Sequence, residues 1–231
     1  ELGPVLLGPL AHPQQNVSAV QGWAAEAAVH SAVVAQETRG EVGADGWRVG
    51  WTVLPPDTPY PPAPAGSQRG VGSASRQRTS AELDESADGS VVNEASLVVL
   101  IDLGTPEGGG LRLAALGDLE LEGQRRLAAR LAARNEQPVD VVKVAHHGSA
   151  KQDAGLYRQL APRVGLIGVG AGNDYGHPSR AALELLEHEQ VAVYRTDRDH
   201  LVALSAGPAP QGGWASPLTV TRVRGIPRAR E

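Results

Sequence analysis

A run of aliphatic residues between positions 139 and 149 ends abruptly in two histidines, and this run constrains the fold more than any other segment. It reads Val-Asp-Val-Val-Lys-Val-Ala-His-His-Gly-Ser. Its β-branched residues have no helical spacing, which is typical of a strand buried on both faces in a layered α/β fold. His146 and His147 then follow the carboxyl end of that strand, where such folds collect ligands and metals.

Two other apolar segments end in comparable polar residues. Residues 111–116 lead into Asp118 through a single glycine, and residues 164–169 lead into a glycine-rich loop that reaches His177. Carboxyl ends of strands in layered α/β folds open onto a shared crevice. The sequence therefore predicts that Asp118, the histidine pair and His177 lie along one rim of a sheet.

The composition limits the kinds of site that the chain can form. Hydrophobic residues make up 41% and charged residues 20% of the 231 residues, as in an ordinary globular protein, but Phe, Met and Cys are absent. Without cysteine, a metal would have to be held by histidine and carboxylate. The net charge of −5 disfavours strong non-specific binding of nucleic acid, so a substrate phosphate would need a metal or local arginines.

The sequence shows neither a nucleotide-binding motif nor a membrane span. The glycines after residue 167 do not have the order of a P-loop or a dinucleotide fingerprint, so no nucleotide cofactor is expected. No stretch of about eighteen apolar residues occurs. The chain begins at Glu1 without an initiator methionine or a leader, and we expect it to be a fragment of a longer protein.

Hydrophobic periodicity and turn residues predict an alternation of strands and helices. Helices are expected over residues 17–34, 119–134, 154–160 and 178–189. Strands are expected at residues 5–7, 39–43, 47–54, 97–103, 111–116, 164–169, 191–194 and 201–204, besides the run before the histidine pair. In the strand 47–54, Trp47, Trp51 and Val53 are expected to share the face that packs on the core.

One domain is expected over residues 1–206, followed by a tail over residues 207–231. Between about residues 55 and 92 the composition changes to proline, then glycine and serine, then acidic residues. This segment cannot bury enough apolar surface to fold, which predicts a disordered insertion inside the domain. A linker between two domains is the alternative.

The predicted rim combines a carboxylate with imidazoles, a ligand set that zinc or manganese accepts. A metal held there lowers the pKa of bound water, and two metals also stabilise both oxygens of an in-line phosphoryl displacement. We therefore expect a hydrolytic reaction.

Each of these residues also has a purely structural interpretation. Asp118 could only cap the helix that follows. His146 and His147 could be one buried and one exposed imidazole, and His177 could fix the turn before a proline. The remaining histidines have no position at a strand end and are not expected to act: His12, His30, His188 and His200.

Five short motifs occur in a characteristic order and spacing. They are Asn-x-x-Ser-Leu-Val-Val-Leu at 93–100, Leu-Gly-Asp-Leu-Glu-Leu-Glu at 116–122, Lys-Val-Ala-His-His-Gly-Ser at 143–149, Gly-Ala-Gly-Asn-Asp-Tyr-Gly-His-Pro at 170–178 and Tyr-Arg-Thr-Asp-Arg-Asp at 194–199. With these motifs the chain, from about residue 3 to residue 205, resembles the carboxy-terminal metallo-β-lactamase-like domain of the ComEC family of DNA-internalisation proteins. His-His-Gly-Ser with Tyr-Gly-His-Pro downstream is the most specific part of the resemblance.

The resemblance implies a fold and roles for the rim residues. The fold would be a metallo-β-lactamase-like α/β fold, a four-layer αββα sandwich that is amino-terminally incomplete in this chain. The complete domain would hold two metals, Zn²⁺ or Mn²⁺. Asp118 resembles the bridging metal ligand and His147 a histidine ligand, while Asp118, His146 and His177 resemble the catalytic residues.

The resemblance also implies partners and a location. The chain would be an extracytoplasmic soluble domain of a multi-pass protein of the cell membrane, with DNA and the membrane channel of the same polypeptide as its partners. Its function would be a metal-dependent phosphodiesterase that degrades the non-transforming strand during natural transformation. The alternatives are a non-catalytic structural or DNA-guiding domain of the same channel, and a hydrolase of a small phosphate or ester.

The chain departs from the family pattern at its start. The family's leading strand with Asp-Val-Gly-Gln-Gly-Asp, and its loop His-x-His-x-Asp-His that supplies most metal ligands, have no counterpart in this sequence. Asn93 and Ser96 occupy positions at which related hydrolases have a further histidine, and they are expected only to support the site. Either the missing residues precede Glu1 or this member has lost them. The site within this chain is therefore expected to be incomplete and to bind metal weakly.

Overall fold

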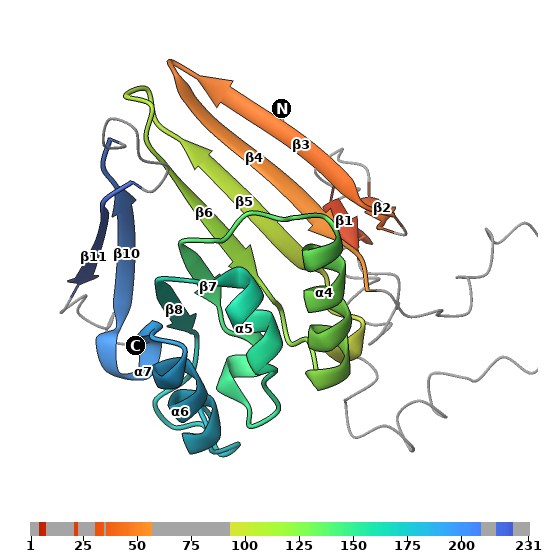
Figure 1. Cartoon of the computed structure of the whole chain (residues 1–231), viewed down its shortest axis with the longest axis vertical. Coiled ribbons are helices and arrows are strands. Elements are labelled where there is room, and N and C mark those ends of the chain that lie inside the picture. The colour runs from red at the N-terminus through yellow and green to blue at the C-terminus, as the bar shows by residue number, and fades with distance from the viewer. Residues whose placement is uncertain are drawn as a thin grey trace, which may run out of the picture.

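The structure of the chain is a computed structural model, which describes residues 5–7, 21–22, 31–34, 36–56, 93–208 and 216–223. Its largest element is a mixed sheet of seven strands. These are β3 (Thr38–Ala44), β4 (Trp47–Leu54), β5 (Val98–Gly104), β6 (Gly110–Ala115), β7 (Val141–Lys143), β8 (Val164–Ile167) and β9 (Ala192–Arg195), and they neighbour one another in chain order. The α/β class expected from the sequence is therefore confirmed (Figure 1).

The sheet changes from antiparallel to parallel pairing at β6. Strands β3 to β6 form an antiparallel meander, whereas β6, β7, β8 and β9 run parallel to one another. Parallel neighbours end at the same edge of a sheet, so the segments that follow these four strands all emerge at one edge. The prediction that three strands end at a common rim is confirmed.

Helices cover one face of the parallel half of the sheet. They are α4 (Leu121–Ala133), α5 (Ala154–Leu160) and α6 (Arg180–His188), and the single turn α7 (Thr196–Asp199) follows β9 (Figure 1). Side chains cap the amino termini of α5 and α6. The Asp153 carboxylate accepts from Leu156 N at 2.8 Å, and the Ser179 hydroxyl oxygen accepts from Ala182 N at 3.1 Å.

The core under these helices is aliphatic, as the absence of phenylalanine and methionine requires. Leu131 of α4, Leu156 of α5 and Leu186 of α6 are at most 1% exposed, and they pack with alternate residues of the sheet such as Ala114 and Val142. Each fully buried leucine contributes roughly 1.5–3 kcal/mol to folding. These contacts fix the helices, and hence the loops that precede them, against the edge of the sheet.

A two-stranded ribbon covers the opposite face. It consists of β10 (Leu201–Ala206) and β11 (Leu218–Val223), paired antiparallel. Leu204 and Val220 of the ribbon pack against a second apolar cluster centred on Val141 and Val164 of the sheet. The described residues thus form a helical layer, a large sheet and a β-ribbon. The four-layer αββα sandwich stays a prediction.

Two details of the predicted elements are wrong. Residues 31–33 belong to strand β2 (Ser31–Val33), which pairs in parallel with β1 (Val5–Leu7), so the helix expected over 17–34 cannot reach its predicted end. Pairing with a distant strand overrides the helix propensity of alanine, which is a weak determinant. Trp47 is 57% exposed rather than part of the core, and it lies next to the turn of the β3–β4 hairpin, where it pairs with Ala44. Val53, at the other end of β4, is 4% exposed as expected.

Other predictions fall wholly or partly outside the described part of the chain. Of the predicted insertion, residues 57–92 are not described, and of the predicted helix over 17–34, Gln21 and Gly22 are helical. Among the described residues, no helix is both long enough and apolar enough to cross a bilayer.

Candidate functional site

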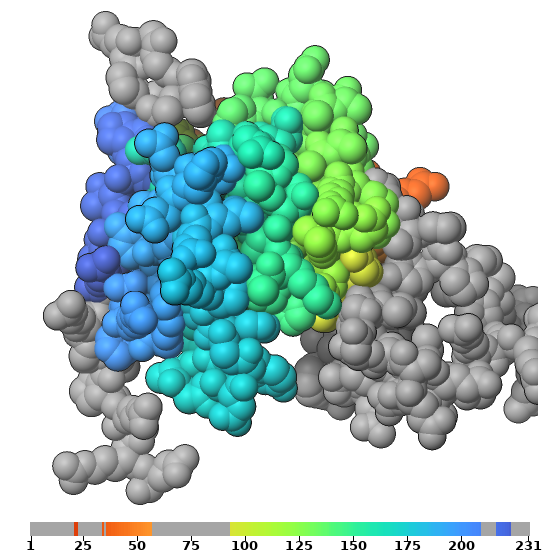
Figure 2. Space-filling model, turned by 60° about the horizontal axis from the view of Figure 1, so that its bottom comes forward, coloured from red at the N-terminus to blue at the C-terminus, as the bar shows by residue number. Residues whose placement is uncertain are grey.

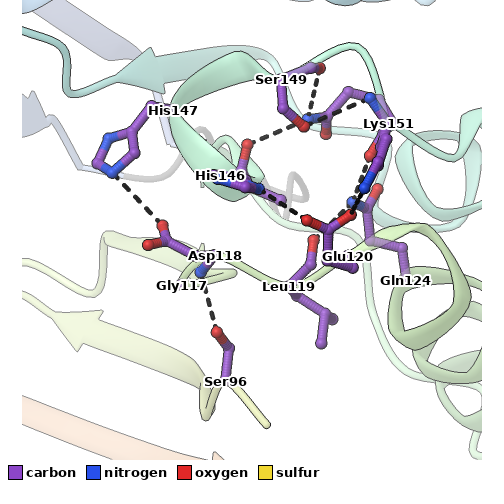
Figure 3. Close-up of polar contacts among 12 residues, drawn as sticks. Ser96, Gly117, Asp118, Leu119, Glu120, Gln124, His146, His147, Ser149 and Lys151 are labelled. Carbon is purple, nitrogen blue, oxygen red and sulfur yellow. Dashed lines mark hydrogen bonds and ion pairs between the residues drawn. The ribbon is translucent and has the colours of Figure 1, made fainter. Parts of the chain in front are cut away.

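Asp118 lies immediately beyond β6, on a turn that requires a glycine before it. Gly117 has φ 58°, and a Cβ at this position would lie 3.0 Å from Cβ of Ser96. The Ser96 hydroxyl oxygen accepts a hydrogen bond from Asp118 N at 3.1 Å (Figure 3). The cap of α4 is Glu120 and not Asp118, so the capping interpretation of Asp118 is wrong and its carboxylate is free to face the rim.

The histidine pair lies in a tight turn, η1 (Ala145–Gly148), directly after β7. His146 and His147 have φ values of 44° and 51°, in the left-handed region that costs a residue with a side chain roughly 1–2 kcal/mol. Gly148 continues the turn at φ 79°, where a Cβ would lie only 2.7 Å from Cβ of Pro178. Strained backbone of this kind persists where the surroundings hold it, and it concentrates at functional sites.

A network of buried hydrogen bonds stabilises this turn. The Gln152 amide nitrogen donates to the carbonyl oxygens of Ala145 and Ser149, both at 3.1 Å, and so bridges the two ends of the turn. The side-chain oxygen Oε1 of Gln152 accepts from the Tyr157 hydroxyl at 2.6 Å, and Tyr157 is fully buried. Burial raises the pKa of Tyr157, which keeps the phenol protonated as the donor in this bond.

A second buried glutamine holds the loop that carries Asp118 and Glu120. The amide nitrogen of Gln124 donates to Leu119 O at 2.8 Å and to Lys151 O at 2.9 Å, and its oxygen accepts from Asp153 N at 2.9 Å. Gln124 is 0% exposed, so unsatisfied amide groups would be costly there. It therefore ties the segment after β6 to the segment after β7 behind the site.

Asp118 and His147 face each other across the rim. The distance between Asp118 Oδ1 and His147 Nε2 is 3.6 Å (Figure 3). On the other side of the same imidazole, His147 Nδ1 lies 2.6 Å from Gly168 O, the first carbonyl after β8. A carbonyl oxygen can only accept, so Nδ1 carries a proton, and in the tautomer of the imidazole with Nδ1–H the lone pair of Nε2 faces Asp118. This is the usual arrangement around a metal-binding histidine.

Lys143 also contacts the Asp118 carboxylate. Its Nζ donates to Gly117 O at 2.6 Å and lies 3.4 Å from Asp118 Oδ1. Burial lowers the pKa of Lys143, and the nearby carboxylate opposes this effect in part. The Asp118 carboxylate thus lies between the ammonium of Lys143 and the imidazole of His147.

His146 points away from His147, towards a buried carboxylate. Its Nδ1 donates to Glu120 Oε1 at 3.1 Å, while the other oxygen of Glu120 binds Lys151 Nζ at 3.2 Å (Figure 3). The Glu120 side chain is 6% exposed. A buried carboxylate that accepts Nδ1–H fixes the orientation of the ring and leaves Nε2 as the free nitrogen.

His177 comes to the same rim from the loop after β8. Its ring centroid is 5.4 Å from that of His146 and 6.2 Å from that of Tyr175, with an angle of 29° between the Tyr175 and His177 planes. Burial lowers the pKa of His177, repulsion from His146 and His147 in their protonated forms lowers it further, and the carboxylates of Asp118 and Glu120 oppose the effect.

The structure thus brings together all four residues that the sequence singled out. Seen from the end at which the parallel strands finish, the segments that carry them form one continuous surface, coloured green to blue in Figure 2. A hollow in this surface is lined by His147, Val169, Gly170, Tyr175 and His177 among others. Within the described residues, no group of three or more histidine, cysteine, aspartate or glutamate side chains is arranged to hold a metal ion.

Sequence reasoning did not identify the residues that support this rim. Glutamate and glutamine are ordinary surface residues, and only the fold buries them here. A single sequence therefore does not indicate a supporting role for Gln124, Gln152 or Tyr157. The one available signal was the position of Glu120 two residues after Asp118, within the motif at 116–122.

The comparisons with known proteins give one curated relative of interest. No model of a protein family matches the chain. The chain is 35% identical over 117 residues to ComE operon protein 3 of Bacillus subtilis strain 168, and the match covers 50% of this chain and 14% of that protein. The chain therefore spans about one seventh of the relative. The likeness supports a relation to a competence-related family, as the sequence motifs indicate.

Proposed function

We propose that the chain is a metal-dependent phosphodiesterase domain of a DNA-uptake protein. The observation that carries the proposal is the pair Asp118 Oδ1 and His147 Nε2, 3.6 Å apart, with Nδ1 of the same imidazole bound to Gly168 O. The likeness to ComE operon protein 3 supports a role in DNA uptake. On this proposal DNA and a membrane channel of the same polypeptide are its partners, and the domain lies outside the cytoplasm.

The donor pair fits two ligands of one cation. Nitrogen and oxygen ligands lie about 2.0–2.2 Å from zinc in tetrahedral sites, which separates two ligand atoms by about 3.3–3.5 Å. The observed 3.6 Å is within a few tenths of an ångström of that separation. Since a carboxylate oxygen and an imidazole lone pair are both acceptors, their approach is favourable only when a proton or a cation lies between them.

Two donors do not complete a ligand set, so the remaining ligands would come from outside the described residues. Zn²⁺ or Mn²⁺ bound there would supply hydroxide near neutral pH and neutralise charge on a phosphodiester. Asp118 and His147 would hold the cation from the ends of β6 and β7, with Gly168 O fixing the imidazole.

The other two histidines would act on the substrate. His146 is oriented by Glu120, which leaves Nε2 available to exchange a proton with the reacting oxygen. Burial and its histidine neighbours lower the pKa of His177, which favours the neutral ring; a neutral imidazole can donate N–H to a phosphate oxygen or accept a proton. The centroids of the two rings are 5.4 Å apart.

A non-catalytic DNA-guiding or structural domain is the second candidate. Lys143 Nζ lies 3.4 Å from Asp118 Oδ1 and already supplies a positive charge to that carboxylate. The described residues also contain no group of three metal-binding side chains. Both observations favour a site that is stable without metal.

Metal binding and nuclease activity distinguish the two candidates. Isothermal titration of Zn²⁺ or Mn²⁺, and cleavage of linear DNA with either ion, are measured for the native protein and for Asp118→Asn and His147→Ala. We expect both variants to lose metal binding and cleavage while keeping the circular dichroism spectrum of the native protein. The matched control is His188→Ala, because His188 is 81% exposed on α6. Unchanged cleavage in both site variants, or intact DNA uptake by cells that carry them, would favour the non-catalytic domain.

A further inference from the structure

The most exposed aromatic ring of the described chain stands beside the candidate site without a packing role. Tyr175 is 85% exposed, yet its ring lies 6.2 Å from that of His177 with only 29° between the planes. The phenol ring is therefore roughly parallel to the His177 ring, and most of its surface is open to solvent. A large ring held in this way offers a flat surface next to the residues proposed to act on a phosphodiester.

The loop that carries Tyr175 is held in place by its own hydrogen bonds. The Asn173 side chain donates to Gly170 O at 3.1 Å and to His177 O at 2.9 Å, and it accepts from His177 N at 3.1 Å. One amide thus ties the two ends of the loop together around Tyr175. The ring is presented by a braced loop, which lowers the entropy lost when a ligand binds to it.

The hollow beside Tyr175 is open above Gly170. Its lining includes Tyr175, His147, Val169 and Gly170. A Cβ added at Gly170 would have no atom within 4 Å, so the space above this residue is free. The hollow shares His147 and His177 with the candidate site, so a group lying in it is adjacent to a phosphodiester bound at the site.

Several polar groups around the hollow are already paired within the protein. Nδ1 of His147 binds Gly168 O, and the Thr196 hydroxyl both donates to Val169 O and accepts from Val169 N, each at 2.7 Å. The Asn173 amide is occupied within its own loop. Apart from Nε2 of His147 and the ring of His177, which face the candidate site, what remains for a ligand is mainly apolar and aromatic surface. Such a surface takes a flat ring by stacking, and it cannot distinguish the hydrogen-bonding edges of different bases.

We propose that the hollow between Tyr175 and His147 is a stacking site for one nucleobase of DNA, next to the phosphodiester and without preference among the four bases. This inference rests on the proposed function, since it takes DNA as the ligand. The net charge of −5 leaves the chain little general attraction for phosphate, and stacking supplies affinity that does not depend on it. The base would lie against the Tyr175 ring and above Gly170, where a Cβ would meet no atom within 4 Å.

Two pairs of variants of the native protein test the stacking site. Tyr175→Ala removes the ring and Tyr175→Phe retains it. Gly170→Leu fills the hollow, whereas Gly172→Leu adds the same side chain to an equally open glycine that does not line the hollow. Binding of a fluorescent single-stranded oligonucleotide is measured by anisotropy without added metal, and cleavage with Zn²⁺ or Mn²⁺ is measured separately.

We expect Tyr175→Ala and Gly170→Leu to weaken binding by about 5- to 150-fold, the range for loss of one stacked base. Tyr175→Phe and Gly172→Leu should bind as the native protein does. Oligodeoxynucleotides that contain only thymine, cytosine, adenine or guanine should show the same losses of affinity. In the cleavage assay the loss should fall on KM more than on kcat, because the ring binds substrate without touching the reacting atoms.

An oligonucleotide of abasic residues separates stacking from phosphate binding. We expect the native protein to bind it about as weakly as Tyr175→Ala does. Equal affinity of the native protein and Tyr175→Ala for the normal oligonucleotide, or equal affinity of the native protein for the normal and abasic oligonucleotides, would overturn the stacking site. Loss of binding in Tyr175→Ala by a protein that neither binds metal nor cleaves DNA would retain the stacking site and refute the phosphodiesterase.

Discussion

Replacing Tyr157 by phenylalanine tests the network that holds the histidine turn. The change removes one hydroxyl, which donates to the Gln152 side-chain oxygen at 2.6 Å, and leaves the buried ring in place. Gln152 uses its amide nitrogen to bind both Ala145 O and Ser149 O, so the hydroxyl acts on the turn through a single side chain. No apolar contact of the Tyr157 ring is lost.

The expected cost follows from the burial of the remaining partner. An acceptor left without its hydrogen bond in a buried position costs about 1–3 kcal/mol, and Gln152 is 9% exposed. We expect Tyr157→Phe to lower the free energy of unfolding by about 2 kcal/mol. For a domain of this size, each kcal/mol shifts the melting temperature by about 2–4 °C, so Tm should fall by about 4–8 °C.

Urea unfolding followed by circular dichroism measures this cost, and Tyr175→Phe is the matched control. The control makes the same chemical change at a side chain that is 85% exposed, and it should alter stability by less than about 0.5 kcal/mol. The amide resonances of His146 and His147 should shift in Tyr157→Phe and stay fixed in the control. Equal stability of the two variants, with unshifted histidine resonances, would refute the idea that this network braces the turn.

Three further predictions concern pH and backbone geometry. Hydrogen bonds and charge from Arg195 hold the pKa of Asp197 below its usual 3.8. Asp197→Asn should therefore lower the free energy of unfolding by about 1 kcal/mol at pH 7, and the difference from the native protein should disappear as acid protonates the native carboxyl. Urea unfolding at a series of pH values measures this difference. The pKa of His177, measured by NMR, should lie below 6.5 and rise in His146→Gln, because burial and the His146 charge both lower it; an unchanged value would exclude the coupling. Gly148→Ala should lower the free energy of unfolding by roughly 1–2 kcal/mol or more, since φ is 79° and the new Cβ would lie 2.7 Å from a carbon of Pro178. A urea unfolding curve equal to that of the native protein would contradict this prediction.

Much of the fold could be predicted from local sequence patterns. The hairpin over residues 39–54, the pair of strands around the turn before Gly110, and the helices near 121–133 and 154–160 all have periodicity or turn residues within a few positions. Polar residues directly after apolar strands predicted the common rim, because parallel strands finish at the same edge. The helical pattern was misleading at residues 31–33, because these residues pair as a strand with β1, about 26 residues earlier in the chain.

The exposure of Trp47 shows a different limit. Alternation along β4 correctly places Trp47 and Val53 on the same face, yet one is 57% and the other 4% exposed. Alternation determines the face of a strand and not how far a covering layer extends along it. The extent of that layer depends on elements elsewhere in the chain.

By itself, the sequence determined the order of strands and helices, the residue types at the strand ends and the absence of thiolate ligands. Only the tertiary structure decided which atoms meet: Asp118 with His147, Glu120 with His146, and Gln152 with both ends of the histidine turn. The physical reason is that local periodicity is encoded within a few residues. A contact between side chains 26 or 29 positions apart depends instead on the register of neighbouring strands and on the packing of the helices between them.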